Sequence, residues 1–343
     1  MNAEGASRQR GRPGQPHAEV ASLSSGCALE HAHLVKPWNV EIEQIAPNSA
    51  CGSVAAVFTP SVLIYEEHWP WQARVRGSNP PGYIVVGAHL GWRRSPLTWC
   101  GGALGPRTLA TAAPSSEIEF SVPEASHHAV ALVTPQFLEQ GLGRQAVDSI
   151  LAGWELKTSR RRGVELGLHI VRAVRRYHRR PEDLTRPLEA WSIESDLMDA
   201  LIQCTQTLAS PLEPTDRPRR ARALAAALEY ADHRQGRVTA RELALSAGVS
   251  QRTLEHAFRE RFGVTPGVFL RLKRLNGAHR ELLASEPGAT TVSKIASNWG
   301  FTHQGRFSAL HRQVFEELPF RTLRRSRPLS LHSLGDTFTL RAG

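Results

Sequence analysis

The 343-residue sequence predicts an α+β protein in which a β-rich N-terminal domain with a helical segment is followed by an all-α C-terminal domain. At about 150 residues per domain, this length predicts two domains. Short apolar runs cut by glycine and proline fill the first part of the chain, which is typical of a small barrel or jelly roll. From Pro135 onward apolar residues recur at helical spacing, and beyond about residue 220 one helical pattern occurs twice.

The β-rich domain is expected over residues 36–135. It follows a leader, residues 1–35, that contains glycine, serine, proline and arginine without periodicity and is therefore predicted to be disordered. Turn residues such as those of Asn79-Pro80-Pro81-Gly82 separate the apolar runs. The runs that predict strands are 53–58, 61–65, 73–76, 83–89, 117–122 and 129–133.

A helical segment is predicted over residues 136–209, with Thr134 and Pro135 at its start. Its last helix, over 188–208, is expected to turn Trp191 inward. The stretch 210–220 contains three prolines and three arginines and reads as a linker. The all-α domain is then assigned to residues 221–327, and a tail to 328–343.

Composition excludes several classes of protein. With 41% hydrophobic and 22% charged residues, the chain has the composition of a typical globular protein, which excludes a chain that is disordered throughout. The four cysteines form no CxxC pair, which argues against a disulfide scaffold or a cysteine zinc module and suits a reducing cytoplasm. No apolar run approaches the roughly 18 residues of a membrane span, so no membrane partner is expected.

The net charge of +10 is concentrated in the last third of the chain. Residues 217–328 hold 21 arginines and lysines but nine acidic residues, a net of +12, so the remainder sums to −2. Positive charge confined to one domain indicates that this domain binds a polyanion, and nucleic acid is the first candidate.

Residues 238–258 have the pattern of a helix-turn-helix. Thr239 can cap a first helix, Gly248 suits the tight turn, and Ser250 can cap a second helix. The apolar positions expected to pack between these helices and their neighbours are Leu243, Ala244, Ala247, Val249, Leu254, Phe258 and Phe262.

The same pattern returns 52 to 53 residues later. Leu243-Ala244 and Gly248-Val249-Ser250 recur as Ile295-Ala296 and Gly300-Phe301-Thr302. Between the copies, residues 269–283 predict a basic amphipathic helix of about four turns. Two recognition helices on one rigid connector can enter successive major-groove segments about 34 Å apart.

Over residues 220–325 these motifs resemble the C-terminal domain of the AraC/XylS family of bacterial transcription regulators. The connector adds Arg274-Leu275, Ala278 and Leu282-Leu283 to the resemblance. Family chains usually continue from the second helix with Phe, Gly and Ser/Thr-Pro. Residues 315–319, Phe-Glu-Glu-Leu-Pro, keep the Phe and the Pro but lack the Gly and the hydroxyl, and His311 stands where an aromatic core residue is expected.

The resemblance points to Arg252, Glu255 and His256 as positions that reach base edges. An arginine can bind guanine in bidentate fashion, and a glutamate can accept from cytosine. In the second unit Gln304 could pair with adenine, but Gly305 and Ala309 offer no side-chain hydrogen bond, so the first unit is expected to discriminate more between sequences. Phosphate or structural contacts are expected from Ser250, Thr302, Arg271 and Arg274. The full predicted DNA-contact set is Ser250, Gln251, Arg252, Glu255, His256, Arg259, Arg271, Arg274, Thr302, Gln304 and Arg306.

The N-terminal half more weakly resembles the cupin-like sensory and dimerisation domain common in this family, which implies a small-molecule effector. Four tryptophans could line its pocket or simply pack in the core: Trp69, Trp71, Trp92 and Trp99. The histidines do not show the spacing of a cupin metal site, so no metal or other cofactor is predicted: they are His31, His33, His68, His89, His127 and His128. No catalytic motif appears, and no enzyme activity is expected.

The sequence therefore predicts a cytoplasmic, sequence-specific transcription regulator, in the activator class, that binds double-stranded DNA and responds to an effector. A homodimer is expected, and RNA polymerase is a further candidate partner. The effector would act by shifting a conformational population. Two alternatives stay open: a cupin-type metalloenzyme fused to a DNA-binding module, and an architectural DNA binder without an effector.

Overall fold

The computed structural model describes residues 18–35, 37–47, 50–91, 97–105, 108–152, 155–158, 160–186, 188–205, 219–286 and 288–325. These residues form two compact units. The sheet unit contains the strands and the helices up to residue 205. The helical unit contains residues 219–325 together with a short segment, residues 43–47, from the N-terminal half.

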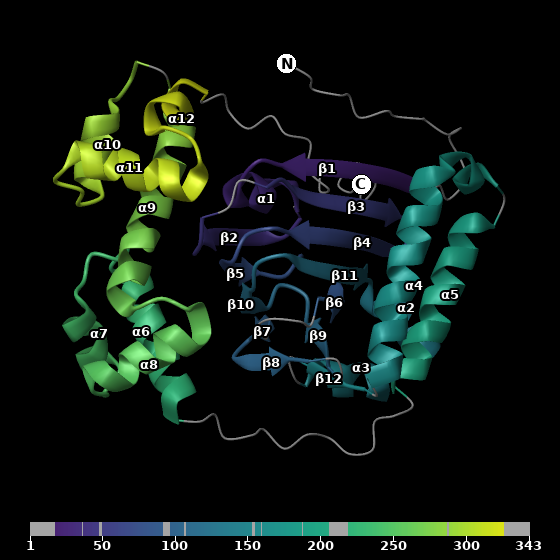
Figure 1. Ribbon diagram of the computed structural model, residues 1–343. Helices are drawn as coiled ribbons and strands as arrows, with labels where there is room; N and C mark the ends of the chain where they lie inside the picture. Colours follow the sequence, from purple (N-terminus) through teal and green to yellow (C-terminus); the bar gives the residue numbers. More distant parts are fainter. Residues whose placement is uncertain are drawn as a thin grey trace. The chain divides into compact units, whose positions relative to one another are not determined.

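The sheet unit has two antiparallel sheets (Figure 1). One runs in the order β1-β3-β4-β11-β6-β9-β12 and the other in the order β2-β5-β10-β7-β8. The strands are β1 (Glu19–Ser25), β2 (Asn39–Gln44), β3 (Gly52–Phe58), β4 (Val62–Trp69), β5 (Ala73–Ser78), β6 (Ile84–His89), β7 (Leu97–Trp99), β8 (Gly102–Leu104), β9 (Thr108–Ala112), β10 (Glu117–Val122), β11 (Ser126–Val133) and β12 (Glu155–Lys157). All six predicted strands are present, because each had a local apolar pattern.

The seven-stranded sheet is buried on both faces. Leu63 and Tyr65 of β4 join the core between the two sheets, whereas Val62 and Ile64 join the core between this sheet and the helices. Side chains alternate along a strand, so a strand covered on both sides reads as a continuous apolar run.

Helices cover the outer face of this sheet (Figure 1). They are α2 (Pro135–Leu142), α3 (Arg144–Leu151), α4 (Arg160–Arg179), the 3-10 helix η1 (Pro181–Thr185) and α5 (Glu189–Thr205). Thr134 caps α2 by accepting a hydrogen bond from the Phe137 N–H, as the sequence predicted. The inward position of Trp191 was wrong, since this side chain is 66% exposed and α5 buries Ile193, Leu197 and Leu201 instead.

The predicted disordered leader is wrong for residues 19–34. Strand β1 pairs with β3 from Glu19↔Phe58 to Ser25↔Gly52, and helix α1 (Ala28–Leu34) buries Ala28 and Leu34. These residues are ordered although they have little apolar pattern of their own, because pairing with β3, rather than local propensity, holds β1 in place. Residues 1–17, most of the predicted linker 210–220, and the predicted tail 328–343 lie outside the described ranges.

The helical unit packs around one apolar core that includes Phe258, Phe262, Phe269 and Phe307. Its helices are α6 (Arg219–His233), α7 (Ala240–Ser246), α8 (Gln251–Phe262), α9 (Pro266–Ala284), α10 (Val292–Asn298), α11 (Gln304–Phe315) and α12 (Pro319–Arg325). Helix α9 connects the pair α7 and α8 with the pair α10 and α11 (Figure 1). Among the described helices, none is long and apolar enough to cross a membrane.

Helix α9 meets Trp299 at a glycine. A Cβ at Gly277 would lie 2.2 Å from the Trp299 ring, and the ring is held by a hydrogen bond from its Nε1 to Glu281 Oε2 (2.6 Å). Gly277→Ala is therefore expected to destabilise the helical unit by about 1–3 kcal/mol through overpacking. Urea denaturation followed by circular dichroism measures this loss.

Gly267 supplies the control in the same helix, since nothing lies within 4 Å of a Cβ built there. Gly267→Ala should be neutral or stabilising by up to about 1 kcal/mol, because alanine loses less backbone entropy than glycine. Equal effects of the two substitutions would show that contact with Trp299 is not what requires the glycine.

Candidate nucleic-acid interface and ligand pocket

The first helix-turn-helix consists of α7 and α8. Thr239 and Glu242 form a reciprocal capping box at the start of α7. Gly248 has a φ of 63° in the turn, a left-handed conformation that favours glycine. Ser250 caps α8 by accepting from the Thr253 N–H (3.1 Å). The sequence predicted the Thr239 cap, the turn at Gly248 and the Ser250 cap, but not the part that Glu242 takes in the first of them.

Helix α8 has a buried face and a solvent face. Leu254, Phe258 and Phe262 are buried, while Gln251, Arg252, His256 and Arg259 are exposed. Glu255 Oε1 forms an ion pair with Arg259 Nη2 at 2.7 Å, and His256 Nδ1 lies 3.8 Å from Glu260 Oε2. Arg252 thus offers a guanidinium on the solvent face at the first turn of the helix.

The second helix-turn-helix consists of α10 and α11. Thr291 caps α10, and Gly300 in the turn has a φ of 75°. Helix α11 has His303 at its N-cap, one residue beyond Thr302, in agreement with the change of spacing from 52 to 53 residues within the second turn. Gln304 Nε2 donates to the Ser293 carbonyl (3.3 Å). Thr302, Gly305, Arg306 and Ala309 are among the exposed positions of this unit.

The two predicted connector arginines differ in environment. Arg271 is exposed. The half-buried Arg274 donates to the Gly300 carbonyl (3.2 Å) and lies over the Phe301 ring, 5.4 Å from its centroid. Burial, together with repulsion from Arg271 and Arg237, lowers its pKa. Arg274 therefore braces the second turn from α9.

The sheet unit contains a mostly apolar pocket between its two sheets, which we call the aromatic pocket after the aromatic side chains in its lining. The cavity measures about 60 Å³, several times the roughly 10–15 Å³ that one water requires. Its aromatic lining consists of Trp38, Tyr65, Trp69, Trp99 and Phe120. Of the four candidate tryptophans, Trp69 and Trp99 line it, Trp71 is buried against Gly52 outside the lining, and Trp92 lies outside the described residues.

Three polar side chains also face this pocket: Glu67, His89 and His128. Burial would raise the pKa of Glu67, but the hydrogen bond with His128 and the nearby His31, whose Nε2 lies 3.6 Å from Oε2, outweigh it and lower the pKa to about 2. His128 Nδ1 lies 3.1 Å from Glu67 Oε1, while its buried Nε2 has no hydrogen-bond partner among the described residues. The pocket therefore joins an ionised carboxylate and an available imidazole nitrogen to apolar walls.

Sequence reasoning considered these histidines only as metal ligands and overlooked Glu67. The signal was present in the alternation of β4, where Tyr65, Glu67 and Trp69 share one face.

The opposite face of β4 carries a second polar cluster. Glu66, His68 and His127 place ligand-type atoms within 4.8 Å of one another. Arg175 of α4 donates to both oxygens of Glu66, at 2.9 Å from Nε to Oε1 and 2.9 Å from Nη2 to Oε2. His127 Nε2 lies 3.1 Å from Oε2. This cluster joins α4 to the sheet, and its carboxylate is already engaged by two side chains.

Comparison with known proteins agrees with the helix-turn-helix geometry. The model of a helix-turn-helix domain family matches residues 243–325. The probable thc operon regulatory protein of Rhodococcus erythropolis is 30% identical over 187 residues, which cover 53% of this chain and 55% of that protein. The chain is therefore similar, above all in its C-terminal part, to regulators of the AraC/XylS family.

Other relatives match only a shorter part of the chain. XylDLEGF operon transcriptional activator 3 of Pseudomonas putida is 32% identical over 96 residues, 28% of this chain and 29% of that protein. A probable AraC family transcriptional regulator from Rhodopseudomonas palustris, known as a crystal structure, is 34% identical with a TM-score of 0.29, covering 31% of this chain and 98% of that chain. The chain spans about half the length, or less, of these curated relatives.

The departures from the AraC/XylS pattern have structural consequences in the second unit. Glu316 takes the left-handed conformation, with a φ of 52°, at the end of α11 where the family usually has glycine. His311 is fully buried, with Nε2 3.0 Å from His279 Nδ1 and Nδ1 2.7 Å from the Glu317 carbonyl. The histidine thus fills the aromatic position and adds a buried hydrogen-bonded chain.

This pair predicts acid sensitivity of the helical unit. Burial lowers the pKa of His311 to about 4 and that of His279 well below its ordinary value, the neighbouring histidine contributing to the latter. Between pH 6.5 and 4 the unfolded chain binds more protons than the folded one, so stability should fall as the pH falls through this range. His311→Phe should reduce that slope, as measured by urea midpoints at pH 7 and pH 4.5.

His233, which is exposed, provides the control. His233→Phe should retain the slope of the parent chain. A His311→Phe variant with the parent's full pH dependence would show that acid destabilises the unit elsewhere.

Proposed function

We propose that this chain is a sequence-specific DNA-binding transcription regulator whose helices α8 and α11 enter two successive segments of the major groove. The observation that carries the proposal is the pair of capped helix-turn-helix units on one buried connector, α9. A single chain with this architecture can read two half-sites one helical turn apart. The +12 charge of residues 217–328 adds attraction to phosphates that does not depend on sequence.

The first unit supplies more of the sequence discrimination in this proposal. Arg252 is exposed and suits bidentate binding of guanine. Glu255 would have to release Arg259 before it accepts from a cytosine amino group. In the second unit, Gly305 and Ala309 offer no side-chain hydrogen bond. Ser250, Arg271 and Thr302 are assigned to contacts with the phosphates or to structural support.

The sheet unit acts as the effector domain in this proposal. Its cavity suits a small, flat and mostly apolar molecule that carries one hydrogen-bonding group for Glu67 or His128. Several relatives are named transcriptional activators, which supports positive control. Contact with RNA polymerase, action as a homodimer and a cytoplasmic location are further parts of this proposal. No reaction step is part of this function.

Selection from a random duplex library with the full chain tests the DNA-binding part. Bound duplexes should share two sequence blocks with centres about 10 base pairs apart. Retained sequences without a common motif would contradict sequence-specific recognition.

Arg252→Ala is expected to cost about 1–3 kcal/mol at one base position of the selected duplex, because a bidentate arginine–guanine contact is lost. Binding to duplexes changed at each position in turn measures this. Arg172→Ala on α4, also exposed, is the matched control and should bind as the parent does. An equal loss on every duplex would instead make Arg252 a phosphate contact.

A thermal-shift screen of small aromatic and aliphatic compounds tests the effector part. A compound that binds in the pocket should raise the melting temperature of the parent and lose most of that effect in Glu67→Gln, which lacks the buried charge. Glu117→Gln, at an exposed site on β10, should respond like the parent. An unchanged shift in Glu67→Gln would place the compound elsewhere.

A further inference from the structure

A segment from the N-terminal half completes the helical unit. Residues 43–47 follow directly on the part of β2 that lies in the sheet unit, yet they contact helices α9 and α11 of the helical unit. Ile45 is 3% exposed and belongs to the same apolar core as Phe258 and Leu275. We refer to residues 43–47 as the docking segment.

The docking segment is bound to α9 through its backbone. The Gln44 N–H donates to Asn276 Oδ1 at 2.9 Å, and Asn276 Nδ2 donates back to the Gln44 carbonyl at 2.9 Å. The Gln44 side chain reaches α11, where Nε2 donates to the Val314 carbonyl at 3.0 Å. A side-chain amide that pairs with both backbone groups of one residue replaces a strand partner, so it recognises an extended segment rather than a helix.

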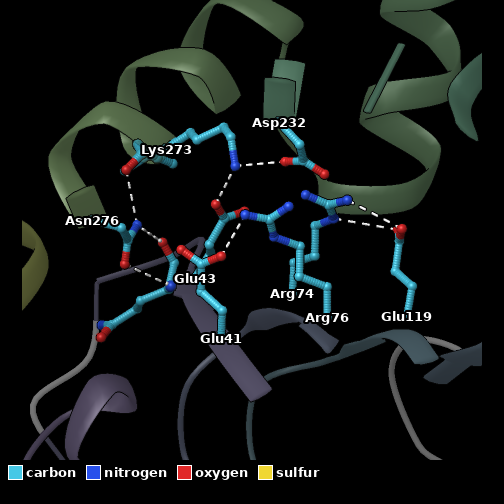
Figure 2. A network of polar contacts seen from close by, with 10 residues as sticks. Glu41, Glu43, Arg74, Arg76, Glu119, Asp232, Lys273 and Asn276 are labelled. Atoms are coloured by element: carbon cyan, nitrogen blue, oxygen red, sulfur yellow. Dashed lines mark hydrogen bonds and ion pairs between the residues drawn. The ribbon is translucent and has the colours of Figure 1, made fainter. Parts of the chain in front are cut away.

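A buried charge is neutralised by the same segment. Lys273 is 5% exposed at its side chain and forms ion pairs with Glu43 and, at 2.6 Å, with Asp232 of α6 (Figure 2). An ammonium group in such a place requires close, well-bonded partners. Glu43, 3% exposed, is therefore as much a part of the unit's interior as the helical residues that surround it.

The other end of the same stretch of chain forms the pocket wall. Val35, Trp38 and Val40 all line the cavity of the sheet unit. From Val40 to Gln44 the chain is the continuous strand β2, in which four residues span about 13 Å. A change in the position of Val40 is therefore passed along an extended strand, which is stiff lengthwise, to the residue held by Asn276.

We propose that the docking segment is the route by which occupation of the aromatic pocket reaches the connector helix α9. The occupant of the α9 surface is residues 43–47 of this chain, and the pairing of Gln44 with Asn276 is its positioning contact. A ligand that moves the β2 wall would change how firmly the segment is docked, and hence the support of the connector between the two recognition helices. This role rests on the proposed function, whereas the docking and its link to the pocket do not require DNA.

Hydrogen exchange of the full chain, followed by mass spectrometry without DNA, tests the docking. Asn276→Ala removes both backbone hydrogen bonds to Gln44 and should speed exchange in peptides that cover residues 43–47 by about tenfold or more. Asn298→Ala, the same change at an exposed site on α10, should exchange like the parent. Unchanged exchange in Asn276→Ala would overturn the proposal.

The link to the pocket is tested by filling the cavity from the wall opposite β2. Ala110→Val adds volume to a lining position on β9, and Ala103→Val makes the same change at an exposed position on β8. Ala110→Val should alter exchange at residues 43–47 at least about threefold, and Ala103→Val should not. In the Asn276→Ala background the effect of Ala110→Val should vanish. No change with Ala110→Val, or a change that persists without Asn276, would overturn the route.

A fallback keeps this test decisive if Ala110→Val unfolds the sheet unit, which exchange in peptides of α4 and α5 would report. Gly87→Ala also fills the pocket, and its added methyl meets Ala110 and Val130 at ordinary contact distances of 3.6 and 3.9 Å. Failure of the exchange tests would leave DNA selection intact, and failure of DNA selection would leave the exchange results intact, so the two proposals are judged separately.

Discussion

The interior of the helical unit depends on the polar side chains that α9 buries. Twelve of the 19 residues of this helix are buried, so most of its circumference is covered, and Lys273, Asn276 and His279 are among them. A buried polar group without a partner is costly. Each of the three therefore requires a particular partner. Lys273 pairs with Asp232 of α6 and with Glu43 of the docking segment, and Asn276 binds Gln44 of the same segment. His279 lies against His311 of α11.

In the sheet unit, two adjacent buried glutamates of β4 likewise have partners that compensate their burial. Glu66 faces the helices, where Arg175 binds it and joins α4 to β4. Glu67 faces the other way, where His128 and His31 keep it ionised at the end of an aromatic pocket. Because side chains alternate between the two covered faces of β4, one carboxylate joins the sheet to a helix and its neighbour is a candidate ligand-binding group.

Local features of the helical unit could be predicted because their causes lie within a few residues. The Thr239–Glu242 capping box, the left-handed Gly248 and Gly300, and the Ser250 cap each depend on a short segment. The repeat of the motif then revealed the connector. That residues 19–34 are ordered could not be predicted in this way. Strand β1 forms only through its pairing with β3, in which Glu19 lies opposite Phe58. Trp191 was misplaced because periodicity alone does not tell which side of a helix is covered.

The sequence by itself determined the class of the protein: a β-rich half, a duplicated helix-turn-helix, and positive charge confined to the latter. These properties follow from composition, spacing and caps, which a one-dimensional pattern records. Only the tertiary structure decided that Glu67 and His128 meet in a pocket and that residues 43–47 belong with helices that begin at Arg219. Such placements depend on which buried polar groups find partners across the fold, and no local pattern encodes that pairing.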